Sequence, residues 1–248
     1  MVGVVAVLAV GGVAATWVAV RNPVAPPTAG PPVSSPATPS TRPSTTPAPT
    51  SSPTSSSAPA DPLAGWTVEQ KVGQLFVVGL DLGTAKQVST DAVTQDHVGN
   101  VFLHGRSTAG VDAVRAQVDG FTALVSAATT HGEPMLVAVD QEGGKVQSLQ
   151  GPGFSTIPAA TEQATVAPAQ LKAQATAWGR ELAAAGVNWN LAPVMDLVPA
   201  SSAAKNPPIG ALQRSYGFTA DSVTTHAGAV LAGMSAAGVG TAIKHFPG

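Results

Sequence analysis

Short runs of apolar residues alternate with helical periods from residue 66 onward. Short stretches rich in apolar residues predict five strands, at residues 75–80, 98–103, 135–139, 187–194 and 239–243, of which 135–139 is apolar throughout and is predicted to be buried on both faces. Apolar residues spaced three or four positions apart predict helices at residues 111–125, 168–185 and 223–238. Strands that alternate with helices or long connections indicate an α/β fold built on a parallel sheet.

Local signals mark where two of the helices begin and end. Thr67 and Gln70 have the spacing of a capping box, which predicts a helix over residues 66–74. Pro168 suits the first turn of the helix that it opens, and Gly186 suits the position just after its end.

The apolar run Met135–Val139 is followed at once by a group of polar residues. Two carboxylates come first, Asp140 and Glu142, and then a Gly143-Gly144 turn and a cation, Lys145. In α/β folds, ligands bind beyond the carboxyl ends of the parallel strands. Taken alone, the two acids fit the start of a solvated loop as well.

The same design recurs along the chain, because every predicted strand after the first ends in polar residues. These residues are His104 and Arg106, Asp140 and Glu142, Asp196, and Lys244 and His245. Polar side chains at one end of successive parallel strands are typical of the catalytic face of a (β/α)8 barrel. The sequence therefore predicts such a barrel, with only about the first five strands present.

The first 62 residues have a different composition and predict no part of the barrel. Residues 1–20 carry no charged side chain and are long enough to span a bilayer, so residues 1–21 are predicted to be a transmembrane anchor or a signal segment. Residues 22–62 are rich in Pro, Ser and Thr and predict a disordered linker. The barrel domain then covers residues 63–248. An anchor with a spacer predicts an extracytoplasmic protein of the cell envelope, membrane-anchored or secreted.

Composition and charge exclude several classes of function. Only 10% of the residues are charged and the net charge is −2, so no basic surface predicts a nucleic-acid partner. The chain has no cysteine, which excludes disulfides, thiolate catalysis and cysteine-ligated zinc. A metal hydrolase could use Asp140, Glu142 and His245, but no ligand spacing such as H-x-x-E-H occurs. We therefore expect no metal and no cofactor.

Five motifs together resemble the N-terminal barrel domain of glycoside hydrolase family 3, in the family's order. The motifs are Lys71-Val-Gly-Gln-Leu-Phe76, Asp140-Gln-Glu-Gly-Gly-Lys-Val-Gln147, Asn190-Leu-Ala-Pro-Val-Met-Asp196, Arg214-Ser-Tyr-Gly217 and Lys244-His-Phe-Pro-Gly248. The D-Q-E-G-G form resembles the β-N-acetylhexosaminidase branch, which acts on glycans that contain N-acetylglucosamine, such as peptidoglycan fragments. Two alternatives remain open: a β-glucosidase of the same family, and a catalytically inert, membrane-tethered glycan-binding protein.

The resemblance implies a sugar-binding role for four residues. Asp140 would accept hydrogen bonds from sugar hydroxyls, and Lys244 and His245 would donate to hydroxyls of the same sugar. Arg214 would reach the sugar ring from the loop after the fourth strand. Glu142 is interpreted as structural support, because the two glycines after it fix a turn.

Two departures from the family pattern limit what these residues can do. Related sequences often carry an arginine where this chain has Ser148, so either Lys145 or Arg106 substitutes for it or the affinity for sugar is lower. In the family, the general acid/base and the nucleophile lie at positions beyond Gly248. The chain is therefore expected to hold the substrate-binding half of a retaining glycosidase, whether it is a fragment or a true truncation.

Overall fold

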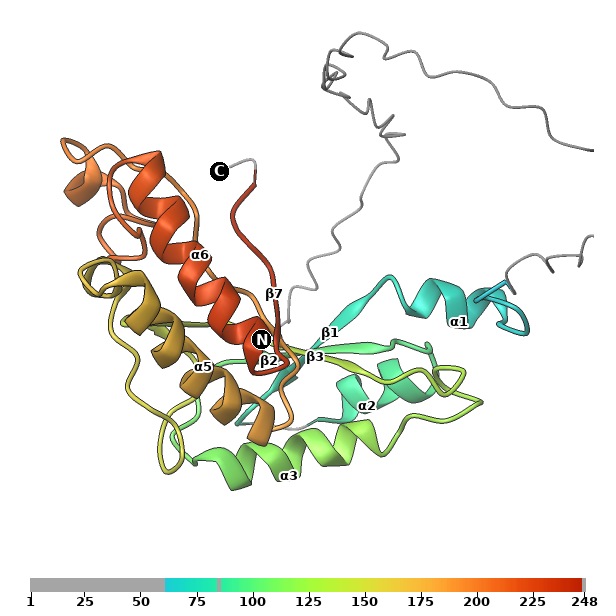
Figure 1. Ribbon diagram of the computed structural model, residues 1–248. Helices are drawn as coiled ribbons and strands as arrows, with labels where there is room; N and C mark the ends of the chain where they lie inside the picture. The colour runs from blue at the N-terminus through green and yellow to red at the C-terminus, as the bar shows by residue number, and fades with distance from the viewer. Residues whose placement is uncertain (1–60, 84–85, 247–248) are drawn as a thin grey trace, which may run out of the picture. The chain divides into compact units, whose positions relative to one another are not determined.

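A parallel five-stranded sheet forms the centre of the computed structural model, which describes residues 61–83 and 86–246 (Figure 1). Its strands follow one another in the order β1-β2-β3-β6-β7. They comprise β1 (Val77–Asp81), β2 (Asn100–His104), β3 (Leu136–Val139), β6 (Trp189–Asn190) and β7 (Gly240–Thr241). The predicted α/β fold with a parallel sheet is confirmed. Neighbours in sequence are neighbours in the sheet, as consecutive strands of a (β/α)8 barrel are, and the closed barrel stays a prediction.

Helices connect the strands, and a small antiparallel hairpin follows β3. The helices are α1 (Val68–Gly73), α2 (Gln87–Thr94), α3 (Val111–Thr122), α4 (Ala160–Gln163), α5 (Pro168–Ala184), the 3-10 helix η1 (Ala203–Lys205) and α6 (Ala220–Ala236). The hairpin pairs β4 (Gln141–Gly143) with β5 (Val146–Gln147). The capping box of Thr67 and Gln70 is present at α1, Pro168 stands in the first turn of α5, and Gly186 follows that helix with a φ of 82°.

Several predicted strand bounds were wrong. The first strand begins at Val77, because Leu75 and Phe76 belong to the turn that ends α1. Their N–H groups donate to the carbonyl oxygens of Val72 and Gly73. The strand predicted at residues 187–194 keeps only two residues of regular pairing, since Pro193 has no N–H to donate to a ladder. Helix α2 was not predicted at all. The first strand also ends in a polar residue, Asp81, like the strands after it.

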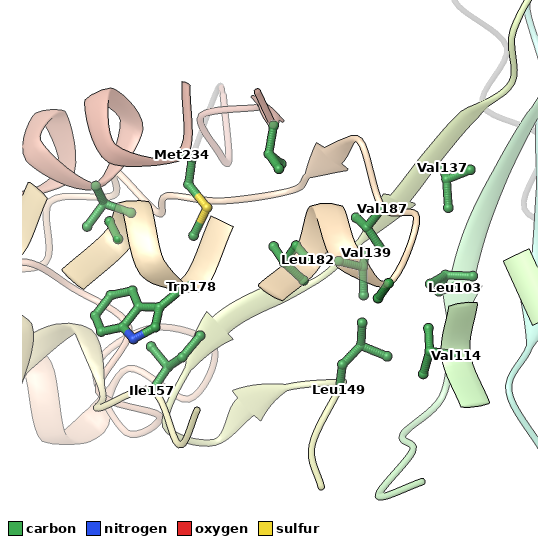
Figure 2. Packing of buried hydrophobic residues seen from close by; sticks show 14 of the residues in the cluster. Leu103, Val114, Val137, Val139, Leu149, Ile157, Trp178, Leu182, Val187 and Met234 are labelled. Atoms are coloured by element: carbon green, nitrogen blue, oxygen red, sulfur yellow. The ribbon is translucent and has the colours of Figure 1, made fainter. Parts of the chain in front are cut away.

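Helices α2, α3, α5 and α6 cover one face of the sheet and form the hydrophobic core with it. Leu103, Val137 and Val139 point toward this core, where their strands lie in register. Figure 2 shows them near Val114 of α3 and Leu182 of α5. A parallel strand–helix–strand crossover is right-handed, so successive crossovers between neighbouring strands place their helices on the same face.

The opposite face of the sheet is apolar but open. A hollow of about 320 Å³ lies on it. Its lining residues come from all strands except β7 and are Val77, Gly79, Phe102, Leu136, Ala138, Trp189 and Leu191. Val77 is 53% exposed, whereas Leu80 on the helix-covered face is fully buried. The strands are therefore apolar on both faces, which is the pattern of a parallel sheet that is buried on both sides.

The two longest helices, α5 and α6, pack closely because glycine stands at their contact. A Cβ on Gly233 would lie 2.5 Å from the Cβ of Ala175 and 2.6 Å from the carbonyl oxygen of Lys172. A Cβ on Gly179 would lie 2.7 Å from the Cβ of Ala237. These distances are shorter than van der Waals contact, so the two helices can lie this close only because glycine has no Cβ at these positions.

The predicted anchor (residues 1–21) and nearly all of the predicted linker (residues 22–62) lie outside the described residues. Within the described ranges, none of the helices has the length and apolarity that a bilayer span needs.

Replacing Gly233 by alanine should destabilise the protein by about 1–3 kcal/mol, although alanine is the better helix former, because the added methyl collides with α5. Gly228 of the same helix is the matched control, since a Cβ there would meet no atom within 4 Å. Gly228→Ala should stabilise the protein by up to about 1 kcal/mol. Urea unfolding followed by circular dichroism measures both changes. Equal effects of the two substitutions would contradict the close helix contact.

Candidate active site

The four residues predicted to bind sugar come together at the carboxyl end of the sheet. Asp140 follows β3 directly, and Arg214 comes from the long loop between β6 and α6. Lys244 and His245 follow β7. The loops that carry these residues are adjacent because the strands are parallel and neighbouring, so their carboxyl ends meet at one edge.

Lys244 joins two carboxylates. Its Nζ lies 2.5 Å from Asp140 Oδ1 and 2.5 Å from Glu142 Oε1. The ammonium is mostly buried, with 16% of its side chain exposed, and Asp140 is the more accessible of the two acids at 32%. The contacts with both carboxylates offset the cost of burying the ammonium group.

Glu142 also accepts a two-fold hydrogen bond from Arg214. The guanidinium Nε lies 2.8 Å from Oε2, and Nη2 lies 2.7 Å from Oε1. The Glu142 side chain is only 6% exposed. The hydrogen bonds from Arg214 to Glu142 raise the pKa of the arginine above its ordinary value, so its positive charge is permanent. Glu142 is thus the shared counter-ion of both cations of the site, a larger role than the structural support that the sequence predicted.

His245 lies between Arg214 and an acid that the sequence did not assign to the site, Asp196. Its Nδ1 lies 2.6 Å from Asp196 Oδ2, and its backbone N–H donates to Oδ1 over 3.1 Å. Its Nε2 lies 3.1 Å from Nη2 of Arg214. Two signals in the sequence indicated Asp196: its place after a predicted strand, and its place at the end of the motif Asn190-Leu-Ala-Pro-Val-Met-Asp196.

These contacts form one continuous row, which we call the carboxylate–cation chain. In order, its members are Asp140, Lys244, Glu142, Arg214, His245 and Asp196. Three carboxylates face one ammonium, one guanidinium and one imidazole. With the imidazole neutral, the row carries a net charge of −1, and negative and positive groups alternate along most of it.

The backbone around Glu142 is held by buried amide groups. The side chain of Gln163 donates to the carbonyl of Glu142 over 3.0 Å and accepts from the hydroxyl of Tyr216 over 3.0 Å. Burial raises the pKa of Tyr216, so its hydroxyl stays protonated and remains a donor. The next residue, Gly143, has a φ of 104°, and a Cβ there would lie 2.4 Å from the carbonyl oxygen of Pro158. Glycine is required at this point for the hairpin to place Glu142.

Asp140 stands on an equally rigid support. The N–H of Gln141 donates to Asn190 Oδ1 over 3.1 Å, and Asn190 Nδ2 donates back to the carbonyl of Gln141 over 3.0 Å. Asn190 is completely buried and belongs to β6. The pair of bonds ties the end of β3 to the neighbouring strand, so the carboxylate of Asp140 starts from a fixed backbone.

The loop that carries Arg214 has its own small core. Val194, Val198 and Ile209 are buried together, and Asn206 accepts hydrogen bonds from the N–H groups of Ile209 and Gly210. Arg214 is fixed to the same loop, because its Nη1 donates to the carbonyl of Pro208 over 2.9 Å. A hollow of about 360 Å³ lies between this loop and the site, with apolar walls and with Arg214 and His245 in its lining.

The two cations considered as substitutes for an arginine at Ser148 are engaged elsewhere. Lys145 donates from Nζ to the carbonyl of Ala211 over 3.1 Å. Arg106 donates from Nη2 to the carbonyl of Lys145 over 2.6 Å. Within the described residues, neither forms an ion pair with Asp140.

Some hydrogen-bonding capacity of the site is not used by the protein. Lysine has three N–H donors and arginine has five. One N–H of Lys244 and one on Nη1 of Arg214 have no acceptor, and Oδ2 of Asp140 has no donor, among residues 61–83 and 86–246. In the same ranges, no three His, Asp or Glu side chains are arranged to hold a metal ion.

Known proteins are similar to this chain in sequence and in fold. Residues 67–248 match the model of the glycosyl hydrolase family 3 N terminal domain. The beta-hexosaminidase LpqI of Mycobacterium tuberculosis is 35% identical over 193 residues, which cover 77% of this chain and 45% of that protein. The chain thus spans less than half the length of that relative.

Two solved structures are similar to the chain. The β-N-acetylhexosaminidase of Beutenbergia cavernae shares 60% sequence identity and has a TM-score of 0.72, over 73% of this chain and 54% of that one. A glycoside hydrolase family 3 β-N-acetylglucosaminidase of Paenibacillus shares 35% identity and has a TM-score of 0.62, over 73% of this chain and 33% of that one.

Replacing Glu142 by glutamine should lower the free energy of unfolding by about 3–5 kcal/mol, because it leaves Arg214 and Lys244 largely buried without their shared counter-ion. Glu133→Gln removes an exposed carboxylate and serves as the control, with an expected change within about 0.5 kcal/mol. Urea unfolding of the full chain measures both. If Glu142→Gln were as stable as the control, the shared counter-ion would not hold the site together.

Proposed function

Because the chain belongs to glycoside hydrolase family 3, as its five motifs predicted, we propose that it serves the retaining hydrolysis of terminal β-linked N-acetylhexosamine residues of glycans. In this proposal the carboxylate–cation chain binds the terminal sugar and orients it. The observation that carries the proposal is the set of unused hydrogen-bonding positions on Asp140, Lys244 and Arg214.

These unused positions suit neighbouring sugar hydroxyls. Each hydroxyl has one donor and two acceptor positions. A hydroxyl can therefore donate to Asp140 Oδ2 while it accepts from the free N–H of Lys244, since the ammonium lies 2.5 Å from the same carboxylate. Asp140, Lys244 and Arg214 are all charged, and charge-assisted hydrogen bonds are about twice as strong as neutral ones. Because both side chains are already fixed, little conformational freedom is lost when the sugar binds.

The names of the relatives favour N-acetylhexosamine over glucose as the sugar. The relative with 35% identity is named a beta-hexosaminidase, and the solved structure with 60% identity is described as a β-N-acetylhexosaminidase. We infer the substrate class from these proteins, with peptidoglycan fragments as one such glycan. A β-glucosidase is the alternative within the family.

The residues of the carboxylate–cation chain bind and orient in this proposal rather than break the bond. Retaining glycosidases need a nucleophile and a general acid/base with carboxyl groups about 5–5.5 Å apart. Glu142 is held by two cations, and Asp196 is held by His245, so neither is free to attack or to donate a proton. We assign the acid/base and the nucleophile to residues outside the carboxylate–cation chain.

The proposal includes a location in the cell envelope, outside the plasma membrane. It is supported by the uncharged residues 1–20 and by the Pro-, Ser- and Thr-rich segment that follows them. A glycan of the cell wall would be accessible to a domain tethered in this way.

Asp140→Ala should weaken the binding of N-acetylglucosamine by the full chain by about tenfold or more, because it removes charge-assisted hydrogen bonds to the sugar. Lys145→Ala is the control. Its ammonium is bonded to the carbonyl of Ala211, so binding should stay within about threefold of the parent chain. Isothermal titration calorimetry measures the affinities, and glucose tests the alternative sugar.

Binding by Asp140→Ala that equals that of the parent chain would overturn the assignment of this carboxylate. Preference for glucose over N-acetylglucosamine would favour the β-glucosidase alternative. Sugar binding by a complete protein that hydrolyses no chromogenic N-acetylglucosaminide would favour the inert glycan-binding protein.

A further inference from the structure

Asp196 holds both the backbone and the ring of His245. Its Oδ1 accepts the backbone N–H of His245 over 3.1 Å, and its Oδ2 lies 2.6 Å from Nδ1. The two residues belong to segments whose backbones are also bonded, since Met195 donates to the carbonyl of Lys244 over 2.8 Å. Only 10% of the Asp196 side chain is exposed, so the surrounding residues restrict the position of its carboxylate.

The hydrogen bonds of His245 define which ring nitrogen carries the proton. Arg214 has only donors, so His245 Nε2 must be the acceptor in the 3.1 Å contact with Nη2. The proton of a neutral ring is then on Nδ1, where the carboxylate of Asp196 can only accept it. The two neighbours therefore require the same tautomer from opposite sides of the ring.

The tautomer also fixes the direction of the Arg214 guanidinium. One N–H of Nη2 and the Nε–H are directed at Glu142, and the second N–H of Nη2 is directed at His245. One N–H of Nη1 donates to the carbonyl of Pro208. The last N–H of Nη1 is left in a defined direction. With the proton on Nε2 instead, two N–H groups would face each other over 3.1 Å, and the arginine or the ring would have to turn.

We propose that Asp196 is a positioning residue for the sugar site, which acts by holding His245 in the Nδ1–H tautomer. Through that ring it keeps the free donor of Arg214 aimed at the substrate, a hydroxylated sugar. This inference rests on the proposed sugar-binding function, but the protonation of the His245 ring can be measured without any sugar. With this tautomer the ring has no N–H of its own for a sugar hydroxyl, so His245 contributes through Arg214.

Asp196→Asn separates the two halves of the proposal. The amide has nearly the shape of the carboxylate, but its NH2 group can donate to Nδ1 and so favours the Nε2–H tautomer. In the full chain labelled with 15N-histidine, in mildly alkaline buffer, long-range 1H–15N correlation spectra report which ring nitrogen of His245 is protonated. A His245→Gln variant assigns the signals. The control is Asp112→Asn, which changes an exposed acid on α3.

The parent chain and Asp112→Asn should show the Nδ1–H tautomer, and Asp196→Asn should show Nε2–H with binding of N-acetylglucosamine weaker by about tenfold. A parent chain with the proton on Nε2, or on both nitrogens, overturns the proposal even if the Asp196 variant does not fold. An Asp196→Asn variant with unchanged tautomer and unchanged affinity also overturns it. A parent chain that shows the Nδ1–H tautomer but binds no sugar overturns the proposed function instead, and leaves the control of His245 by Asp196 intact.

Discussion

The burial of one carboxylate, that of Glu142, organises this site. A carboxylate that loses its water must be matched by cations and hydrogen bonds, and Glu142 obtains them from Arg214, 72 residues later, and from Lys244 in the segment that follows β7. The carboxylate oxygens of Glu142 therefore join three segments: the hairpin after β3, the loop between β6 and α6, and the residues after β7. Asp140 and the pair of His245 and Asp196 extend the same row outward to solvent on either side.

The protein fold provides this arrangement through backbone constraints rather than through surface charge. Gly143 allows the hairpin after β3 to turn sharply. Gln163 donates to the carbonyl of Glu142, and Tyr216 in turn donates to Gln163. The helix-covered face of the sheet is densely packed and gives the strands a fixed register. As a result, the acids at the strand ends are positioned before any ligand arrives, which is what preorganised recognition requires.

Much of the fold could be predicted from the sequence, because hydrophobic periodicity and helix-capping residues are local features of each segment. The parallel sheet, the helices α3, α5 and α6 and the capping box of α1 follow from such signals. Helix α2 and the true start of β1 could not be predicted in this way. Leu75 and Phe76 are as apolar as strand residues, and only the turn bonds at the end of α1 decide their conformation. Polar residues at the ends of apolar runs pointed to Asp140, Lys244 and His245, whereas Arg214 and the sugar-binding roles came from the resemblance of the motifs to a known family. The partners of Glu142, Asp196 and His245 could not be predicted, because they depend on contacts between distant segments.

The sharing of Glu142 between two cations also determines how many segments a single substitution affects. A substitution of Glu142 leaves Lys244 with the carboxylate of Asp140 alone and leaves Arg214 without a carboxylate partner among the described residues, so it disturbs two distant segments at once. Asp140 and Asp196 each hold one partner and stand at the ends. A single substitution at either end of the row therefore affects one partner residue, whereas a substitution of Glu142 affects both cations at once.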